Sequence, residues 1–137
     1  MAPRTLRSLD AHTASLLAGL SLQYALGMYV NLFVSFPEHG SGGQAWEFAL
    51  TQAPLVSHIL LAFLLFFGAI ALCIRAVRLK DTRWIWCAAI GLLGILMAGL
   101  SGSEFVASQS DSYSYVMSLG FLVAAISYSW GLFKIRR

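Results

Sequence analysis

The sequence predicts an all-α protein, an integral membrane four-helix bundle with both termini in the cytoplasm. Three observations support this prediction. Apolar residues make up 58% of the 137-residue chain and charged residues only 11%, which is far from the balance of a soluble domain. The apolar residues fall into four runs, each long enough for a helix to cross a bilayer. The basic residues lie outside these runs, in segments that alternate with acidic loops.

The second apolar run is the clearest of the four. It extends from Pro54 to Ile74 without a formal charge. As a helix its 21 residues would be about 31 Å long at about 1.5 Å per residue, which matches a bilayer hydrocarbon core. We expect one four-span domain, 1–137, with spans at about 12–36, 54–74, 84–102 and 113–133. The first run is longer than a signal-peptide core and no small-x-small cleavage site follows it, so we expect it to be retained.

The distribution of basic residues predicts the orientation. All nine Lys and Arg residues precede the first span, separate the second from the third, or follow the fourth: Arg4, Arg7, Arg75, Arg78, Lys80, Arg83, Lys134, Arg136 and Arg137. Because such residues resist translocation, these segments should be cytoplasmic, in a multi-pass protein of the cell membrane. The net charge of +3 is explained by topology and not by nucleic-acid binding, because the cations form no basic face. The partner that this pattern predicts is the lipid bilayer.

The two remaining loops should lie outside. The first, Pro37 to Ala53, begins with turn residues, while Trp46 to Leu50 could form a short interfacial helix anchored by the tryptophan. The second, roughly Ser101 to Ser112, is short and rich in serine.

Small residues form a stripe in the third span. Gly91, Gly94, Ala98 and Gly102 lie three or four positions apart, a spacing that lets two helix backbones approach closely in a membrane. Two interpretations stand: a packing face within the chain, or the contact of a homodimer or larger membrane complex through Gly91, Gly94 and Ala98. Cys73 and Cys87 lie near one end of successive spans, as packing residues or, alternatively, as a metal or redox pair.

The candidate functional residues are polar groups inside the spans. Gln23, Gly27 and Asn31 recur every four positions, so we expect them on one helical face that points into the bundle, where amides bond neighbouring helices or line a ligand or water cavity. Counted from the outer ends, Asn31, His58 and Met117 each lie about five residues inside their spans, with Ser101 close by. They should share a layer roughly 6 to 8 Å deep, with Gln23 about 12 Å deeper.

Haem b is the candidate cofactor of this layer. A neutral imidazole ligates haem iron and a methionine thioether can supply the opposite axial position, and helical bundles hold cofactors between facing helices. His58 would be the metal ligand, with Met117, Asn31, Gln23 and Ser101 completing the cofactor site. The alternatives are a structural histidine bonded to Asn31 or Ser101, and proton or quinone chemistry. No phosphate loop, nucleophile elbow or zinc-spaced cluster occurs, so no catalytic residue is assigned and the question of an enzyme stays open.

One motif resembles a known family. Gln23-x-x-Leu26-Gly27-x-x-Val30-Asn31 is similar to the first-span motif of the haem A synthase family, whose four-helix halves carry Gln-x-x-Leu-Gly-x-x-Val-Arg. The resemblance implies that His58, near the outer end of the second helix, ligates haem and that Glu47 corresponds to a loop glutamate. The chain departs from the family at Asn31, at Ile59 after the histidine, where the family has arginine, and in a fourth span without histidine. The resemblance therefore implies a haem-binding relative or a degenerate bundle, and not haem A synthesis itself.

Two functions follow from the sequence. The first is a small membrane protein that binds b-type haem or another hydrophobic cofactor in the outer half of the bundle, for electron transfer or haem handling. The alternative is a non-catalytic membrane protein that packs against a partner and holds no cofactor.

Overall fold

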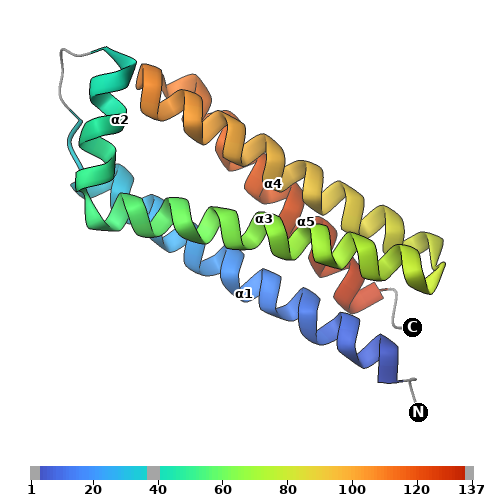
Figure 1. The fold of residues 1–137 in the computed structure, drawn as a ribbon. Helices are drawn as coiled ribbons and strands as arrows, with labels where there is room; N and C mark the ends of the chain where they lie inside the picture. Colours follow the sequence, from blue (N-terminus) through green and yellow to red (C-terminus); the bar gives the residue numbers. More distant parts are fainter. Residues whose placement is uncertain (1–3, 37–40, 135–137) are drawn as a thin grey trace.

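The computed structural model describes residues 4–36 and 41–134, the side chains of 4–6 and 134 aside. These residues form five helices, as predicted for an all-α chain (Figure 1). The elements are α1 (Arg4–Phe33), α2 (Gly42–Thr51), α3 (Ala53–Leu79), α4 (Thr82–Ser108) and α5 (Asp111–Lys134).

The four long helices are long and apolar enough to cross a membrane. Mean hydropathy reaches 2.5 in α3 and is lowest, at 1.3, in the α1 segment Arg7–Phe33. A lipid-facing surface explains why large apolar side chains such as Leu64, Phe67 and Leu93 are more than half exposed, since the bilayer removes them from water. The protein is thus a multi-pass membrane protein, as the sequence predicts.

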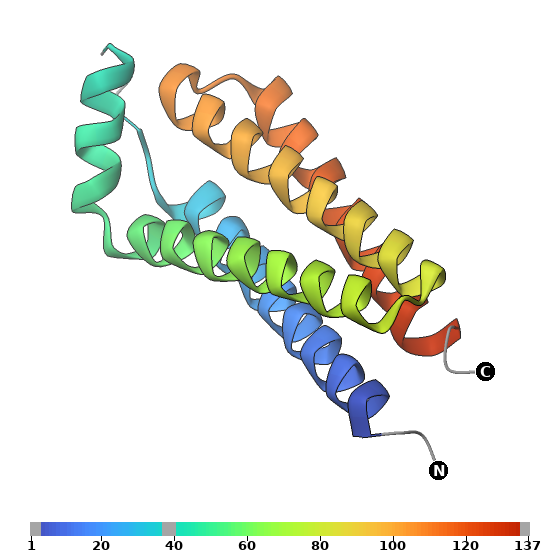
Figure 2. The ribbon, with the colours of Figure 1, turned by 45° about the vertical axis from the view of Figure 1, so that its right-hand side comes forward.

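The long helices are arranged as two pairs. α1 packs along α3, and α4 packs along α5. The pairs lie close together where α3 turns into α4 and separate toward the opposite end, where α2 crosses between them (Figures 1 and 2). α1 begins and α5 ends at the same end as the α3–α4 turn, which agrees with an even number of crossings.

Short connections and specific caps set the helix boundaries. Between α3 and α4, Lys80 takes a left-handed conformation with φ 54°, and the Asp81 carboxylate then accepts bonds from the backbone N–H groups of Arg83 and Trp84 at 3.0 and 3.4 Å. Ser41 starts α2 with a capping box to Gln44. These contacts satisfy backbone donors that a helix N-terminus otherwise leaves free.

Two helices extend beyond the predicted spans. The helix after Pro54 continues beyond Ile74 to Leu79, and α4 continues to Ser108. The outer loop expected from Ser101 to Ser112 is therefore reduced to Gln109 and Ser110. Polar residues end a hydrophobic run, but they do not end the backbone hydrogen bonding of a helix. A 27-residue helix is about 40 Å long, which is enough to extend from the hydrocarbon core into the headgroup region.

Small residues bring α4 and α5 into backbone contact. A Cβ on Gly94 would lie 2.7 Å from the Gly120 carbonyl oxygen, and one on Gly120 would lie 2.6 Å from the Gly94 oxygen. The small-residue stripe of α4 is thus covered by α5 of the same chain, one of the two interpretations that the sequence allows. Nearby, the Cys87 thiol donates to the Ser127 carbonyl at 2.9 Å while the Ser127 hydroxyl donates to the Cys87 carbonyl at 2.8 Å.

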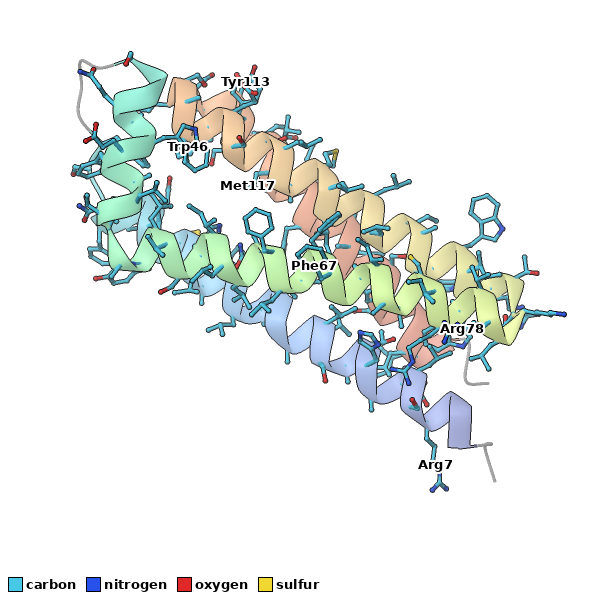
Figure 3. The ribbon with its side chains drawn as sticks, viewed as in Figure 1. Arg7, Trp46, Phe67, Arg78, Tyr113 and Met117 are labelled. Carbon is cyan, nitrogen blue, oxygen red and sulfur yellow. The ribbon has the colours of Figure 1, made fainter. Side chains whose placement is uncertain are left out.

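The short helix expected at Trp46 to Leu50 is present as α2 and is longer than expected. Its Ala49 is buried in a cluster with Val30 of α1, Leu55 of α3 and Val106 of α4, and Trp46 packs against that cluster. Trp46 projects from α2 toward α4 (Figure 3). α2 therefore joins the two helix pairs at the end where they separate.

Candidate functional site

The centre of the site is a hydrogen bond between α1 and α3. Gln23 Nε2 lies 3.1 Å from His58 Nε2, and both side chains are half-buried. The backbone of α1 at Gly27 lies against the imidazole. A Cβ on Gly27 would lie 3.1 Å from His58 Cε1 and 3.7 Å from His58 Nδ1. The missing side chain of Gly27 is what allows the ring to lie against the backbone of α1.

The predicted inward face of α1 is right for Gln23 and Gly27 and wrong for Asn31, which is exposed. The reason is helical geometry. A step of four residues advances about 400° at about 100° per residue, so the direction drifts by about 40° per step and by about 80° between Gln23 and Asn31. A step of seven residues drifts by only about 20° in the other sense, and Val30, seven positions after Gln23, is accordingly buried at 7% exposure.

The depth of the layer also differs from the prediction. Counting from helix ends places His58 level with Asn31, but the imidazole meets Gln23. Gln23 lies ten residues before the end of α1, whereas His58 lies five residues after the start of α3. The two helix ends are therefore staggered by about five residues, or roughly 8 Å, and a count that assumes level ends selects the wrong amide.

Two polar atoms at this contact have no partner among the described residues. Gln23 Oε1 and His58 Nδ1 are both buried and unbonded. The assignment of the amide oxygen and nitrogen, and of the ring proton, does not change the number of unbonded atoms. In either assignment, one polar atom of each side chain forms the hydrogen bond and the other polar atom has no partner. The contact thus retains one unused amide atom and one unused ring nitrogen inside the membrane.

The other predicted site residues lie on the second helix pair. Ser101 is buried, at 8% exposure. Met117 of α5 packs on the backbone of α4 at Gly102, since a Cβ on Gly102 would lie 3.2 Å from Met117 Sδ. Figure 3 labels Met117 where it projects from α5. Within residues 4–36 and 41–134, no contact joins Met117 to His58, so their pairing as axial ligands stays a prediction.

Several aromatic side chains of α1 and α5 face outward. Tyr24 stacks on Phe121 of α5 with ring centroids 5.4 Å apart, which adds a link between α1 and α5 beside Gln23. Phe33 and Tyr115 are 69% and 67% exposed. Glu47 lies on the exposed side of α2.

Sequence reasoning missed a second polar contact between the same two helices. The Arg75 guanidinium of α3 reaches α1, where Nη2 donates to Ser8 Oγ and Nη1 donates to His12 Nδ1 at 3.0 Å. The sequence shows Arg75 only as one cation of a basic turn and His12 as the first residue of a span. The signal that could have joined them is topological, because antiparallel spans bring the start of the first beside the end of the second.

In the part of the chain that the structure describes, no group of three or more His, Cys, Asp and Glu side chains could hold a metal ion. Ligation of a haem iron by His58 stays a prediction.

The four apolar helices and the polar contact between two of them define the class of this protein, a small multi-pass integral membrane protein with a polar site within the bundle. No protein-family model matches the chain, and no curated protein or solved structure matches it either. The resemblance to the haem A synthase family therefore rests on the residues quoted above and stays a prediction.

Proposed function

We propose that this membrane protein binds a hydrophobic cofactor at the Gln23–His58 contact, for electron transfer or cofactor handling. The supporting observation is the pair of buried, unbonded atoms, Gln23 Oε1 and His58 Nδ1. Polar groups inside a membrane are costly and mark functional sites, and a buried polar atom without a partner needs an explanation. A bound molecule with its own polar or metal group would supply the missing partner.

Haem b is the first cofactor to test. The chain offers His58 as an axial ligand, and Gln23 would act as a positioning residue, because a hydrogen bond to one imidazole nitrogen fixes the orientation and basicity of the other. Haem, when bound, supplies one-electron chemistry. The ring nitrogen that Gln23 leaves for a ligand is His58 Nδ1, which lies beside Gly27.

An absorption spectrum of the protein purified from haem-replete cells tests this proposal. We expect a Soret band that is lost in His58→Ala and retained in His12→Ala, the matched control in which a histidine of the same bundle is removed. A colourless wild-type protein from such cells contradicts haem binding. A band that survives His58→Ala places haem at another site.

A second candidate function is favoured by the close packing of the imidazole on Gly27 and its bond to Gln23. Here His58 serves only to hold α1 against α3, and the protein acts by packing against a partner in the membrane. This interpretation expects a colourless protein whose stability falls in His58→Leu and in Gln23→Leu by similar amounts. The double variant should then cost no more than either single change, because one hydrogen bond is removed in all three.

We also propose that both termini lie on the cytoplasmic side of the cell membrane and that α2 lies on its outer surface. The support is that every basic residue lies within the first seven residues, between Arg75 and Arg83 around the α3–α4 turn, or within the last four residues, as the positive-inside rule requires. A membrane-impermeant maleimide tests this in a chain whose two cysteines are replaced by alanine. Glu47→Cys in α2 should be labelled in intact cells, and Arg83→Cys only after the membrane is opened; the reverse pattern overturns the orientation.

A further inference from the structure

A polar contact joins α1 to α3 at the end of the bundle opposite α2. The Arg75 guanidinium of α3 donates from Nη1 to His12 Nδ1 at 3.0 Å and from Nη2 to Ser8 Oγ. All three side chains are half-buried. His12 lies about 16 Å nearer the start of α1 than Gln23 does, so this contact is separate from the Gln23–His58 contact. Nothing in the proposed cofactor function uses it.

The contact requires a neutral His12. A guanidinium carries only N–H donors and keeps its charge, so His12 Nδ1 has to be the acceptor and carries no proton. The proton of the neutral ring is then on Nε2, which lies toward the backbone of α3, since a Cβ on Gly68 would lie 3.9 Å from it. The imidazole thus lies between the Arg75 guanidinium and the α3 backbone in its neutral form.

Protonation of His12 would reverse this contact. A proton on Nδ1 turns the acceptor into a donor, so two N–H donors would face each other across 3.0 Å without a hydrogen bond. A second positive charge would also lie beside the guanidinium, and like charges repel more strongly where protein and lipid replace water. The guanidinium then has to turn away from His12, and the same movement breaks its bond to Ser8.

The carboxylates of the neighbouring helices do not offset this repulsion. α1 packs against α3 and α5, and α1 and α3 together contain one carboxylate, Asp10. Asp10 lies two positions before His12, which is about 200° around the helix, so its side chain leaves the opposite side of α1. Asp111 begins α5 at the other end of the bundle (Figure 1). Asp81, in the α3–α4 turn, accepts from the backbone of Arg83 and Trp84.

His12 is the group at this contact that responds to pH near neutrality. Histidine is the side chain whose ordinary charge change falls between pH 5 and 8, and His12 is the only histidine in this half of α1, α3 and α5. Besides Asp10, the other titratable side chains in that half are Arg4, Arg7, Cys73, Arg75, Arg78, Tyr128 and Lys134. None of these is a carboxylate that could balance an imidazolium.

We propose that His12 is a proton sensor that controls the α1–α3 contact. With a neutral imidazole, Arg75 bridges the two helices, and the first turns of α1 stay docked on α3. With a protonated imidazole, the bridge breaks and the start of α1 separates from α3. The docked form binds one proton fewer than the separated form, so docking strengthens as pH rises through the imidazole range and weakens as pH falls through it.

Distances between two spin labels, measured by double electron–electron resonance, test the proposal in the intact protein. The labels are attached at exposed positions, Ala11→Cys on α1 and Val77→Cys on α3, after Cys73 and Cys87 have been replaced by alanine. The protein is held in discs of phosphatidylcholine. We expect one distance at pH 8 and a second, longer distance at pH 5. The ratio of the two populations should change by up to about tenfold per pH unit, the limit for one proton.

Three variants assign the response to this contact. His12→Asn keeps an acceptor oxygen close to the position of Nδ1 but does not titrate, so the single distance of pH 8 should persist at pH 5. Arg75→Gln removes the guanidinium and should make the distances independent of pH. Arg83→Gln removes an exposed cation of α4 and should keep the wild-type response. Equal distances at pH 5 and pH 8 in the wild type overturn the proposal. A pH response that persists in His12→Asn or Arg75→Gln, or that disappears in Arg83→Gln, also overturns it.

Discussion

Replacing Gly94 by alanine should separate α4 from α5, because the new methyl group meets backbone that cannot rotate away. The Cβ would lie 2.7 Å from the Gly120 carbonyl oxygen and 2.8 Å from the Ala124 amide nitrogen. Ordinary van der Waals contact begins near 3.4 Å, so the helices must part by roughly 0.7 Å. Such overpacking costs about 1–3 kcal/mol.

Gly99 provides the matched control on the same helix. A Cβ there meets nothing within 4 Å, so Gly99→Ala keeps the gain in helix propensity of about 1 kcal/mol that both substitutions share. The difference between the two variants therefore isolates the clash. We expect the unfolding equilibrium constant of Gly94→Ala to exceed that of Gly99→Ala by about 5- to 150-fold, since 1.4 kcal/mol corresponds to tenfold.

Equilibrium unfolding in mixed micelles, followed by the circular dichroism of the helices or by tryptophan fluorescence, measures this difference. Gly120→Ala should behave like Gly94→Ala, because its Cβ would lie 2.6 Å from the Gly94 oxygen. Equal stability of Gly94→Ala and Gly99→Ala would refute the close backbone contact described for α4 and α5.

Three further changes test single contacts by the same unfolding measurement. Gln23→Leu should destabilise the protein by about 0.6–1.7 kcal/mol, the range for hydrogen bonds between membrane helices. Asn31→Leu, at an exposed amide of the same helix, should not destabilise it. Equal effects of the two substitutions would contradict the Gln23–His58 bond. Ser127→Ala removes the hydrogen bond to the Cys87 carbonyl and should lower the free energy of unfolding by about 1 kcal/mol. The Ser118 hydroxyl donates to the Ser114 carbonyl of its own helix, so Ser118→Ala should lower it by less. Asp81→Ala should lose about 0.5–2 kcal/mol with the cap of α4, and Asp81→Asn should keep most of it; a similar loss in both would show that capping is not the cause.

The sequence was sufficient for the number of long helices, because a hydrophobic run directly reports the length of chain that lipid can surround. It was not sufficient for where those helices end. Glu104 and the serines beside it stop the hydrophobic run, yet they extend α4 to Ser108, since exposed polar side chains do not interrupt backbone hydrogen bonding. Helix boundaries near the headgroups depend on caps such as Asp81, and these have a weaker sequence signal than hydropathy.

The candidate site was predicted in part. Gln23, Gly27 and His58 are brought together by α1 and α3, but the choice of Asn31 as the closest amide failed, because helical drift and the stagger of the two helix ends both act against it. The contact of Arg75 with Ser8 and His12 could not be read from hydropathy. A cation at a span end has two uses, as a topology signal and as a hydrogen-bond donor, and only the packed structure shows that Arg75 turns inward.

The two-residue connection at Gln109 and Ser110 has a consequence for how the protein is made. Its ends are already close when the last helix leaves the ribosome, so little chain entropy opposes closure of the α4–α5 hairpin, and the glycines on both sides can meet at once. α1 and α3, in contrast, are separated by a loop and by α2, and they can associate before α4 is synthesised. We therefore expect assembly in two local steps, with the final docking of the hairpin onto the first pair as the step most exposed to failure during membrane insertion.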